Sequence, residues 1–460
     1  MKETITIFFA VLSLLHLTAK ELTLEESIEM ANCRNNELLA QKSALESSDW
    51  GEKNALSNFM PKVSFNSAMV HIDEDSYDAA NSVYQIPVFG SDGNPTGDFL
   101  PFSYSAMSGG VFKTSFINDI TVQQPVFNGG KVIIGYQLSK LAKEKAIYSL
   151  KDKENDIAYR VALNFLSILK IKEVLELSKQ SVESSKAHLT NVQNKYKVGT
   201  VKKTDVLQWE VKLQNDETAL NEIENNLNVL LSVWRNLLNT EEDLQPAEIN
   251  ICDYDAEILI YASMDRDRIC AEVEKIIEIT KSSNPVLKSF RTTNEMLDKH
   301  ILLAKGNFLP SLNTQFTYQI ENDDEFDFDG DDSWNFLAAL SVPIFSGGTN
   351  YTNMEKTRST VKESRLNLQS ATDNIIIGTK NAYYNLITKA QSVENNRSAL
   401  ESAKENYKLI NNLFEQGMIT NSDLLDADIM LFASKMNLVS SYYDFLISKY
   451  ELKKFTNENQ

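Results

Sequence analysis

The chain contains a long internal repeat, and this feature limits the folds that it can adopt. Residues 124–130, Gln-Pro-Val-Phe-Asn-Gly-Gly, recur 218 positions later as residues 342–348, Val-Pro-Ile-Phe-Ser-Gly-Gly. In both copies, a second glycine, Gly199 or Gly417, lies 69 positions after the last glycine of this motif. A repeat at a fixed interval is typical of chains that build two copies of one structural unit. The sequence therefore predicts two equivalent repeats, each containing an element of constant length.

The composition of the constant interval favours one long helix in each repeat. Neither segment, 131–198 or 349–416, contains a proline. Each contains a single glycine, Gly135 in the first and Gly378 in the second. At 1.5 Å per residue, such a helix is about 100 Å long. Steps of alternately four and three residues indicate a coiled-coil seam in each helix. The two seams are Ile171, Leu175, Ser178, Val182, Ser185, Leu189, Val192 and Tyr196, and Lys389, Val393, Asn396, Leu400, Ala403, Tyr407, Ile410 and Phe414.

Shorter helical patterns flank each long helix, so the helical part is predicted to be a fused bundle. Each repeat has two of them, which can stack end to end along the long helix. They cover residues 24–57, 205–238, 285–305 and 423–453.

The segments between the helices alternate with a period of two, which indicates β-strands. An Asn-Phe-Met-Pro motif at 58–61 and its copy Asn-Phe-Leu-Pro at 307–310 precede a pair of such segments in each repeat. The predicted strands cover residues 62–72, 111–127, 311–320 and 333–345. A tilted transmembrane strand needs about ten residues. Two soluble hairpins on a helical bundle remain the alternative.

After residue 19 no run of about 18 apolar residues occurs, so any membrane crossing is expected to use the strands. Four strands cannot close a barrel, and open strand edges in lipid leave backbone groups unsatisfied. Several copies must then share one barrel, and three copies would supply about twelve strands. The predicted fold class is mainly helical, with a duplicated long-helix coiled-coil bundle and transmembrane β-structure in a trimeric barrel.

The sequence also predicts the boundaries of the repeats. Lys2 and the short apolar run after it are typical of a secretory signal at residues 1–19, with a buried N-terminal helix as the alternative. The first repeat is then 20–245, the inter-repeat segment is 246–283, and the second repeat is 284–460. In the inter-repeat segment, Cys252 and Cys270 can form a disulfide in an oxidising compartment.

Several functions are disfavoured by the sequence. The net charge of −19 disfavours nucleic acid as a partner. The four histidines lack partners at metal-ligand spacing, and no phosphate-binding loop or nucleophile elbow is visible. The acidic loop 321–332 does not match an EF-hand, because the position that needs a glutamate falls on Phe336. We therefore expect no enzymatic activity, no cofactor and no metal site.

The repeated motifs resemble those of the TolC family of outer-membrane efflux and secretion channels, over essentially the whole mature chain. The resemblance rests on the duplication, the Asn-Phe-Leu-Pro entry to the strands, the Pro-Ile-Phe-Ser-Gly-Gly corner, and the Gly-Thr turn followed by Thr-Asp-Val-Leu at 204–207. It implies a homotrimer with a twelve-stranded barrel among the lipids of the Gram-negative outer membrane and a helical tunnel in the periplasm. It also implies a passive exit duct of a tripartite efflux pump or type I secretion system, with a periplasmic adaptor protein and an inner-membrane transporter as partners.

The resemblance assigns roles to particular residues. The strand-to-helix corners would be Pro125, Gly129, Gly130, Pro343, Gly347 and Gly348. The turns that contact the adaptor would be Val198, Gly199, Thr200, Gln416, Gly417 and Met418. Asp423 and Asp426 would form the pore constriction, with mutual repulsion raising some of their pKa values.

The chain departs from better-known family members where they lock the entrance with an arginine and a tyrosine. Here Ile419 and Phe414 occupy those positions, so apolar packing is expected to close the entrance instead. A surface-anchored trimeric coiled-coil adhesin or structural stalk is the alternative function. Such proteins usually carry their barrel segment at the C-terminus, whereas this chain ends in a predicted helix.

Overall fold

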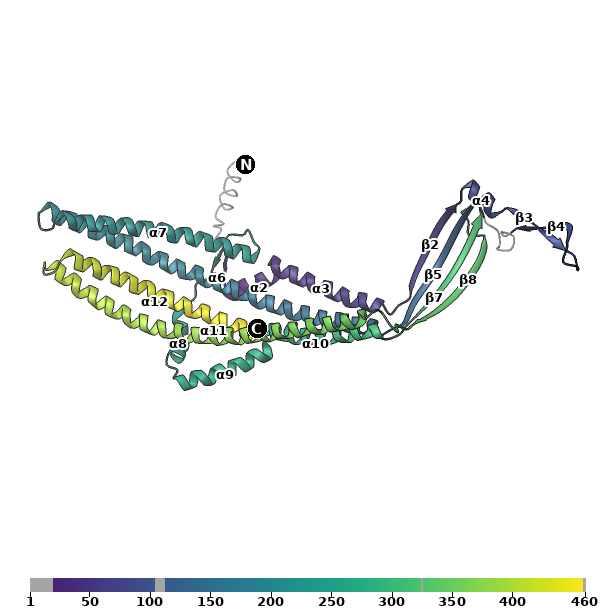
Figure 1. The fold of residues 1–460 in the computed structure, drawn as a ribbon. Coiled ribbons are helices and arrows are strands. Elements are labelled where there is room, and N and C mark those ends of the chain that lie inside the picture. Colours follow the sequence, from purple (N-terminus) through teal and green to yellow (C-terminus); the bar gives the residue numbers. More distant parts are fainter. Residues whose placement is uncertain (1–19, 104–111, 324–325, 458–460) are drawn as a thin grey trace, which may run out of the picture. The chain divides into compact units, whose positions relative to one another are not determined.

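The computed structural model describes residues 20–103, 112–323 and 326–457 (Figure 1). The predicted signal peptide, 1–19, lies outside the described residues. The chain divides into two compact units, which are treated separately below. The helical unit consists of Met1–Ser48, Lys143–Asn294 and Ser364–Gln460, and the sheet unit consists of Asp49–Ala142 and Glu295–Glu363.

The two repeats have helices of equal length, as the constant interval predicts. The long helices are α6, Lys131–Lys197, and α11, Thr349–Glu415, with 67 residues each. The returning helices are α7, Lys203–Leu238, and α12, Asn421–Thr456, with 36 residues each. In the helical unit, α6 with α7 and α11 with α12 form two antiparallel hairpins (Figure 1). No helix in the described part of the chain combines the length and apolar content needed to cross a bilayer.

The hydrophobic core of the helical unit lies where the helices of both repeats meet. Trp234 of α7 is fully buried and stacks edge-on against Phe165 of α6, with ring centroids 6.1 Å apart. Leu386 of α11 and Phe445 of α12 belong to the same cluster. Several seam positions are buried as predicted, among them Ser178, Val182, Ser185, Val192, Val393, Leu400, Ala403 and Phe414, whereas Tyr196 is exposed.

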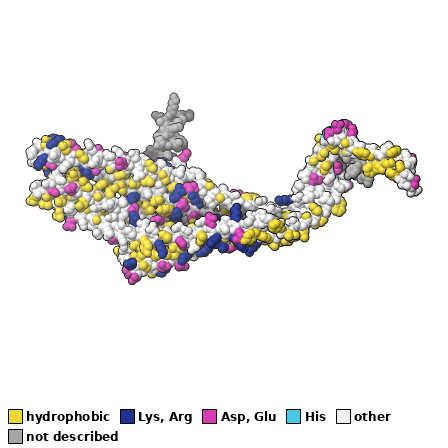
Figure 2. Space-filling model, in the orientation of Figure 1, with side chains coloured by type: hydrophobic (Ala, Val, Ile, Leu, Met, Phe, Trp, Pro, Cys, Tyr) yellow, Lys and Arg dark blue, Asp and Glu magenta, His cyan; other side chains and the backbone are white. Residues whose placement is uncertain are grey.

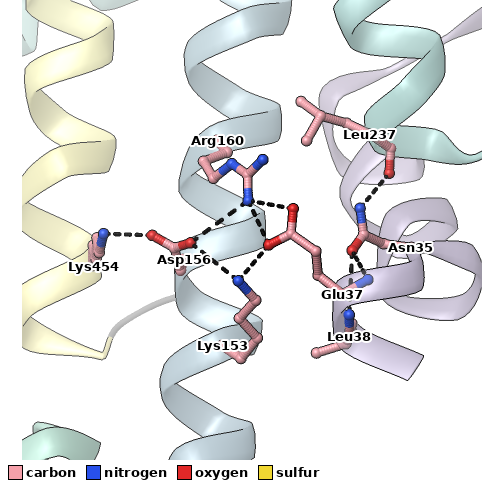
Figure 3. Close-up of polar contacts among 8 residues, drawn as sticks. All are labelled: Asn35, Glu37, Leu38, Lys153, Asp156, Arg160, Leu237 and Lys454. Atoms are coloured by element: carbon pink, nitrogen blue, oxygen red, sulfur yellow. Dashed lines mark hydrogen bonds and ion pairs between the residues drawn. The ribbon is translucent and has the colours of Figure 1, made fainter. Parts of the chain in front are cut away.

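The segment predicted as one helix over 24–57 is two helices. They are α2, Leu24–Arg34, and α3, Asn36–Ser57, separated by the buried Asn35. The Asn35 Nδ2 donates to the carbonyl oxygen of Leu237 on α7 at 2.9 Å (Figure 3). Its Oδ1 accepts from the backbone nitrogens of Glu37 at 3.0 Å and Leu38 at 3.2 Å, which caps α3. Asn35 therefore ends one helix, starts the next and joins both to α7.

The second repeat has the same asparagine break. Asn284 lies between α9, Arg266–Ser283, and α10, Pro285–Lys305. Its Nδ2 donates to the carbonyl oxygen of Phe455 on α12 at 3.0 Å, and its Oδ1 accepts from the nitrogens of residues 286 and 287. Asn35 and Asn284 are 249 positions apart, the same offset as the two Asn-Phe-X-Pro motifs. The duplication thus includes a tertiary hydrogen bond that the helical periodicity does not reveal.

The inter-repeat segment, of uncertain form in the sequence, is largely ordered structure. β6, Leu244–Pro246, pairs in parallel with β1, Lys20–Leu22. The helices η1, Ile251–Tyr254, and α8, Asp255–Ala262, follow and lead to α9.

The disulfide that the sequence allows is not formed. Cys252 on η1 and Cys270 on α9 are both free and exposed, and α8 separates them along the chain. In this structure the two cysteines are therefore single thiols, and the bridge stays a possibility that the sequence allows.

Asp444 on α12 joins three long helices of the helical unit. Its two carboxylate oxygens accept from the Nζ of Lys170 on α6 and the Nζ of Lys389 on α11, each at 2.9 Å. Burial raises the pKa of Asp444, but the hydrogen bonds from the two ammonium groups outweigh burial and hold this pKa below its ordinary value. The ion pairs are therefore expected to act as a pH-dependent clamp between the repeats.

We expect Asp444→Asn to lower the free energy of unfolding at pH 7 by about 1 kcal/mol, and by much less at pH 3. A carboxyl group with a depressed folded pKa stabilises the fold above its unfolded pKa of about 3.9. That contribution is lost as the pH falls through the folded value. Thermal unfolding followed by circular dichroism at both pH values measures the difference. Glu176→Gln is the control, because Glu176 pairs with Lys179 on the same helix and both are exposed; an Asp444→Asn effect equally large at pH 3 contradicts the prediction.

The sheet unit holds one four-stranded antiparallel sheet in the order β2-β5-β7-β8. The strands are β2, Lys62–His71, β5, Thr114–Asn128, β7, Ser311–Asp323, and β8, Asp331–Ser341. The register of the central strand β5 shifts between Pro125 and Phe127, where proline cannot donate a ladder hydrogen bond. β8 ends before Pro343 instead of reaching residue 345. The four strands predicted from the sequence therefore form, with different ends.

The two faces of this sheet differ in polarity. One row across the strands is Phe65, Ile120, Tyr318 and Trp334, and the next row on the same face is Val63, Val122, Phe316 and Phe336. The opposite face carries the rows Ser64, Thr121, Thr317 and Asn335, and Asn66, Asp119, Gln319 and Ser333. Trp334 is 68% exposed and Phe336 is 62% exposed in the single chain. The sheet therefore has one apolar face, one polar face and two unpaired edge strands, β2 and β8.

The connection between β2 and β5 contains further secondary structure. It contains α4, Glu74–Ala80, and an antiparallel pair of strands, β3, Val83–Phe89, and β4, Pro95–Ser103. We call this pair the ribbon. Its prolines and glycines disrupt the alternating pattern by which strands are recognised, so the sequence did not indicate it.

Candidate functional site

Two glycine turns close the helical hairpins and form the centre of the candidate site. Gly199, between α6 and α7, has φ +77°, and Gly417, between α11 and α12, has φ +73°. The backbone nitrogen of Thr200 donates to the Lys195 carbonyl at 3.0 Å, and that of Met418 donates to the Leu413 carbonyl at 3.0 Å. These bonds are typical of helix ends that finish in a left-handed glycine. The six residues predicted for adaptor contact lie in these turns and are exposed.

An aspartate caps the returning helix after each turn. Asp205 accepts from the Lys202 backbone nitrogen at 2.9 Å, and Asp423 accepts from the Thr420 backbone nitrogen at 2.9 Å. The Thr420 hydroxyl also donates to Asp423, at 2.6 Å. Both hydrogen bonds lower the pKa of Asp423, and the one from the Thr420 hydroxyl has the larger effect. In the single chain the pKa of this constriction candidate is thus lowered and not raised, because capping acts on the carboxylate and no second copy is present to repel it.

Asp426 lies three residues after Asp423 on α12, and both side chains are exposed. Residues three apart share a helix face, so the structure brings the two carboxylates to one side of α12. The first repeat has Gln208 in place of Asp426, so only the second hairpin presents two acids.

A buried apolar cluster joins the two hairpins next to the turns. We call it the tip cluster. Its members come from α6, α7, α11 and α12 and are Val192, Val206, Trp209, Phe414 and Leu424. Phe414 is 6% exposed, and Ile419 packs against the cluster. Both residues predicted to close the entrance therefore lie in one apolar contact region between the hairpins.

Polar contacts that the sequence did not indicate reinforce the tip cluster. The Trp209 Nε1 donates to the Asn421 Oδ1 at 2.8 Å, and the Asn421 Nδ2 donates to the Gln208 Oε1 at 3.2 Å. The His188 ring stacks on Trp209 with centroids 4.6 Å apart, and its Nε2 lies 3.2 Å from the Tyr407 hydroxyl. The three hydrogen bonds join the α6–α7 hairpin to α11 or α12, whereas the ring stacking lies within the α6–α7 hairpin. The only sequence signal was the placement of a tryptophan and a histidine on helical segments near the same turn.

Further from the turns, largely buried charged side chains of both hairpins lie near one another. Lys212 contacts both carboxylate oxygens of Asp216 at 2.6 Å, and the Ser185 hydroxyl donates to the same carboxylate at 2.6 Å. Asp428 is 8% exposed, and burial raises its pKa, against the opposing effects of Lys212 and His188. Burial also lowers the pKa of His188. The sequence did not single out Asp428, because acidic residues on a helix are usually on its exposed face.

A cleft of about 520 Å³ opens between the two turns. Lys195 and Lys202 line it on the side of the first hairpin, and Phe414, Glu415 and Gly417 line it on the side of the second. The two hairpins therefore contact each other through the tip cluster while a mixed polar and apolar recess remains at their ends.

The chain matches the family model for outer membrane efflux proteins over residues 27–239 and 276–458. It is 23% identical over 307 residues to the outer membrane protein TolC of Vibrio cholerae, covering 65% of this chain and 67% of that protein. It is 20% identical over 348 residues to the alkaline protease secretion protein AprF of Pseudomonas aeruginosa, covering 72% of this chain and 67% of that protein. The matched regions thus span about two thirds of these relatives' own length.

The fold is that of solved outer-membrane channels. The Campylobacter jejuni CmeC outer membrane channel superposes with a TM-score of 0.72 at 16% identity, covering 94% of this chain and 85% of that one. The two family matches fall one on each repeat, and the fold agrees over both units. The adhesin or stalk left open by the sequence is therefore excluded. The chain belongs to the outer membrane efflux protein family and, like its TolC-type relatives, is an outer-membrane channel protein for efflux or secretion.

Proposed function

We propose that three copies of this chain form one passive duct through the outer membrane and the periplasm, and that the tip cluster holds its inner end closed. One observation carries the proposal: the sheet has an apolar face, a polar face and two free edges. Pairing β8 of one copy with β2 of the next removes every open edge when the ring closes. Members of this family are trimeric, and three four-stranded sheets make a barrel of about twelve strands.

The proposed duct needs partner proteins that supply the energy for transport. The described residues offer no nucleotide-binding loop, so the energy for transport is expected to come from an inner-membrane transporter, with a periplasmic adaptor protein between the two. The exposed turns Val198–Thr200 and Gln416–Met418 are the proposed adaptor contacts. Their backbone is held by the glycine caps, and all six residues are exposed to solvent. AprF is named for protease secretion and CmeC as an outer membrane channel, and both names are compatible with an exit duct.

The proposed constriction lies one helical turn inside the second hairpin. Asp423 and Asp426 are exposed on one face of α12, so three copies would present about six carboxylates to the pore. Such a ring attracts cations and binds multivalent ones. The Thr420 hydrogen bonds lower the pKa of Asp423 and so favour its charged form, which opposes the effect of repulsion within the ring.

Single-channel recording in planar bilayers tests the constriction. We expect the double variant Asp423→Ala and Asp426→Ala to lose cation selectivity and to need about tenfold more of a trivalent cation for block. Losing about 1–2 kcal/mol of electrostatic attraction gives this factor. Asp205→Ala is the matched control, because Asp205 is the equivalent helix cap in the first hairpin and has no second acid beside it. If the double variant keeps its selectivity and its block, the carboxylates are a solvated helix face and the constriction is wrong.

A further inference from the structure

The ribbon formed by β3 and β4 carries large apolar side chains on both faces, with the polar Gln85 and Ser103 on one of them. On one face, Tyr84 pairs with Phe102 and Ile86 pairs with Leu100. On the other face, Pro87 pairs with Phe99 and Phe89 pairs with Pro95. Tyr84, Phe89, Phe99 and Leu100 are each between 56% and 62% exposed in the single chain. In Figure 2, hydrophobic side chains gather over the part of the molecule that Figure 1 labels β3 and β4.

An isolated two-stranded ribbon with this surface is not stable in water by itself. Two strands form a marginal structure unless a hydrophobic face is covered. Exposed apolar surface of this extent marks an interaction site in a soluble segment. Two faces must be covered here, so the partner surface has to reach both sides of the ribbon.

The polarity of the ribbon argues against lipid as the cover. Its turn, Gly90–Asn94, is polar and self-contained: the Asp92 carboxylate accepts from the backbone nitrogen and the side chain of Asn94, at 3.2 Å and 3.1 Å. A segment that inserts into a bilayer would carry its apolar residues at the tip. Residues 83–103 also contain no lysine or arginine that could bind anionic lipid headgroups.

We propose that each ribbon packs between the ribbons of the two neighbouring copies, so that three ribbons form an apolar cap at the outer mouth of the duct. This inference rests on the proposed trimer. The ribbon follows β2, the free edge strand where the next copy must join, so it continues from the proposed interface between copies. In a ring of three, every copy has two neighbours and uses a different surface for each. A ribbon that carries large apolar side chains on both faces meets this requirement.

Trimer formation also holds the three ribbons close together, so each is at a high effective concentration for the others. The barrel fixes the three points from which they emerge, so their association becomes intramolecular and needs little affinity of its own. The second repeat has a much shorter connection between its strands, residues 324–330, so only the first repeat builds the cap. The consequence is a narrowed exit at the outer end, in addition to the closed inner end.

Disulfide cross-linking between opposite faces tests this contact. In a chain with Cys33, Cys252 and Cys270 replaced by serine, the double variant Ile86→Cys and Phe99→Cys places one thiol on each face. These two thiols cannot bond within one ribbon, because residue 86 pairs with residue 100 and residue 99 pairs with residue 87. We expect mild oxidation of membranes to give covalent dimers and trimers on denaturing gels. Each single variant should remain monomeric.

Thiol labelling of the two single variants measures burial independently. We expect a membrane-impermeant maleimide to react with Ile86→Cys and Phe99→Cys about tenfold more slowly than with Ser91→Cys, a factor that corresponds to about 1.4 kcal/mol of burial. Ser91 lies in the exposed polar turn of the same ribbon and is the matched control. The difference should disappear when heat in detergent dissociates the trimer.

The outcomes separate this inference from the proposed function. A conducting trimer without cross-linked species overturns the ribbon contact alone. If its labelling at residues 86 and 99 is still slow, lipid or another protein covers the ribbon. A monomeric sample without conductance overturns both proposals.

Discussion

Replacing Phe414 with alanine should make the closed channel leak. Phe414 is buried in the tip cluster against residues of the other hairpin, and the Lys195 ammonium lies 4.1 Å from its ring centroid. Removing a buried phenylalanine side chain costs about 3–5 kcal/mol. If opening separates the hairpins, a large part of this energy is lost from the closed state only. We expect the leak conductance in planar bilayers to rise roughly tenfold or more.

The leak measurement also decides between apolar and ionic closure. Leu413→Ala is the control, since Leu413 precedes Phe414 but is 37% exposed. High salt screens ion pairs and leaves apolar packing intact, so Phe414→Ala should raise the leak more than salt does. The opposite order, with salt opening the wild-type channel and the alanine variant remaining tight, would show that charged contacts hold the entrance.

Gly129→Ala should prevent the sheet unit from forming, whereas Gly347→Ala should be tolerated. Both glycines are at the equivalent strand-to-helix corner, with φ +69° and +61°, so alanine costs about 1–2 kcal/mol at either. A Cβ at Gly129 would also lie 2.3 Å from the carbonyl oxygen of Gly306, while a Cβ at Gly347 meets nothing within 4 Å. Relieving a backbone clash needs a shift of the main chain, about 3 kcal/mol or more.

The repeat supplies the control for this prediction, because the two corners share their motif and their backbone conformation. We expect the heat-sensitive trimer to be absent from membranes of cells that produce Gly129→Ala and present with Gly347→Ala. Equal amounts of trimer from the two variants would mean that the backbone at Gly306 can move away at little cost. This result would contradict the close approach of the main chain at Gly129 to that at Gly306.

Local rules account for the features that the sequence predicted well. Glycine is required where the backbone turns left-handed, so Gly199 and Gly417 marked the hairpin turns without knowledge of the fold. The absence of proline and the 69-residue interval gave helices of 67 residues within one residue of their predicted ends. Alternation gave the four strands of the sheet because one face is apolar and the other polar.

The candidate site was predicted in part. The turns, the capping aspartates and the position of Phe414 follow from the spacing of the two copies. The residues of the other hairpin that surround Phe414 cannot be predicted from this spacing. Trp209 and Asn421 are 212 positions apart, and His188 and Tyr407 are 219 apart. A single sequence carries no signal for such pairs, because helical periodicity reports which face is buried and not what covers it.

By itself, the sequence determined the repeat, the helix lengths, the turns and the four-stranded sheet, because each depends on residues close together in the chain. Only the tertiary structure decided the breaks at Asn35 and Asn284, the free thiols, the tip cluster and the ribbon. The breaks need a carbonyl of a distant helix, the tip cluster needs two hairpins in contact, and the ribbon carries large apolar side chains on both faces and therefore lacks the alternation that identifies a strand.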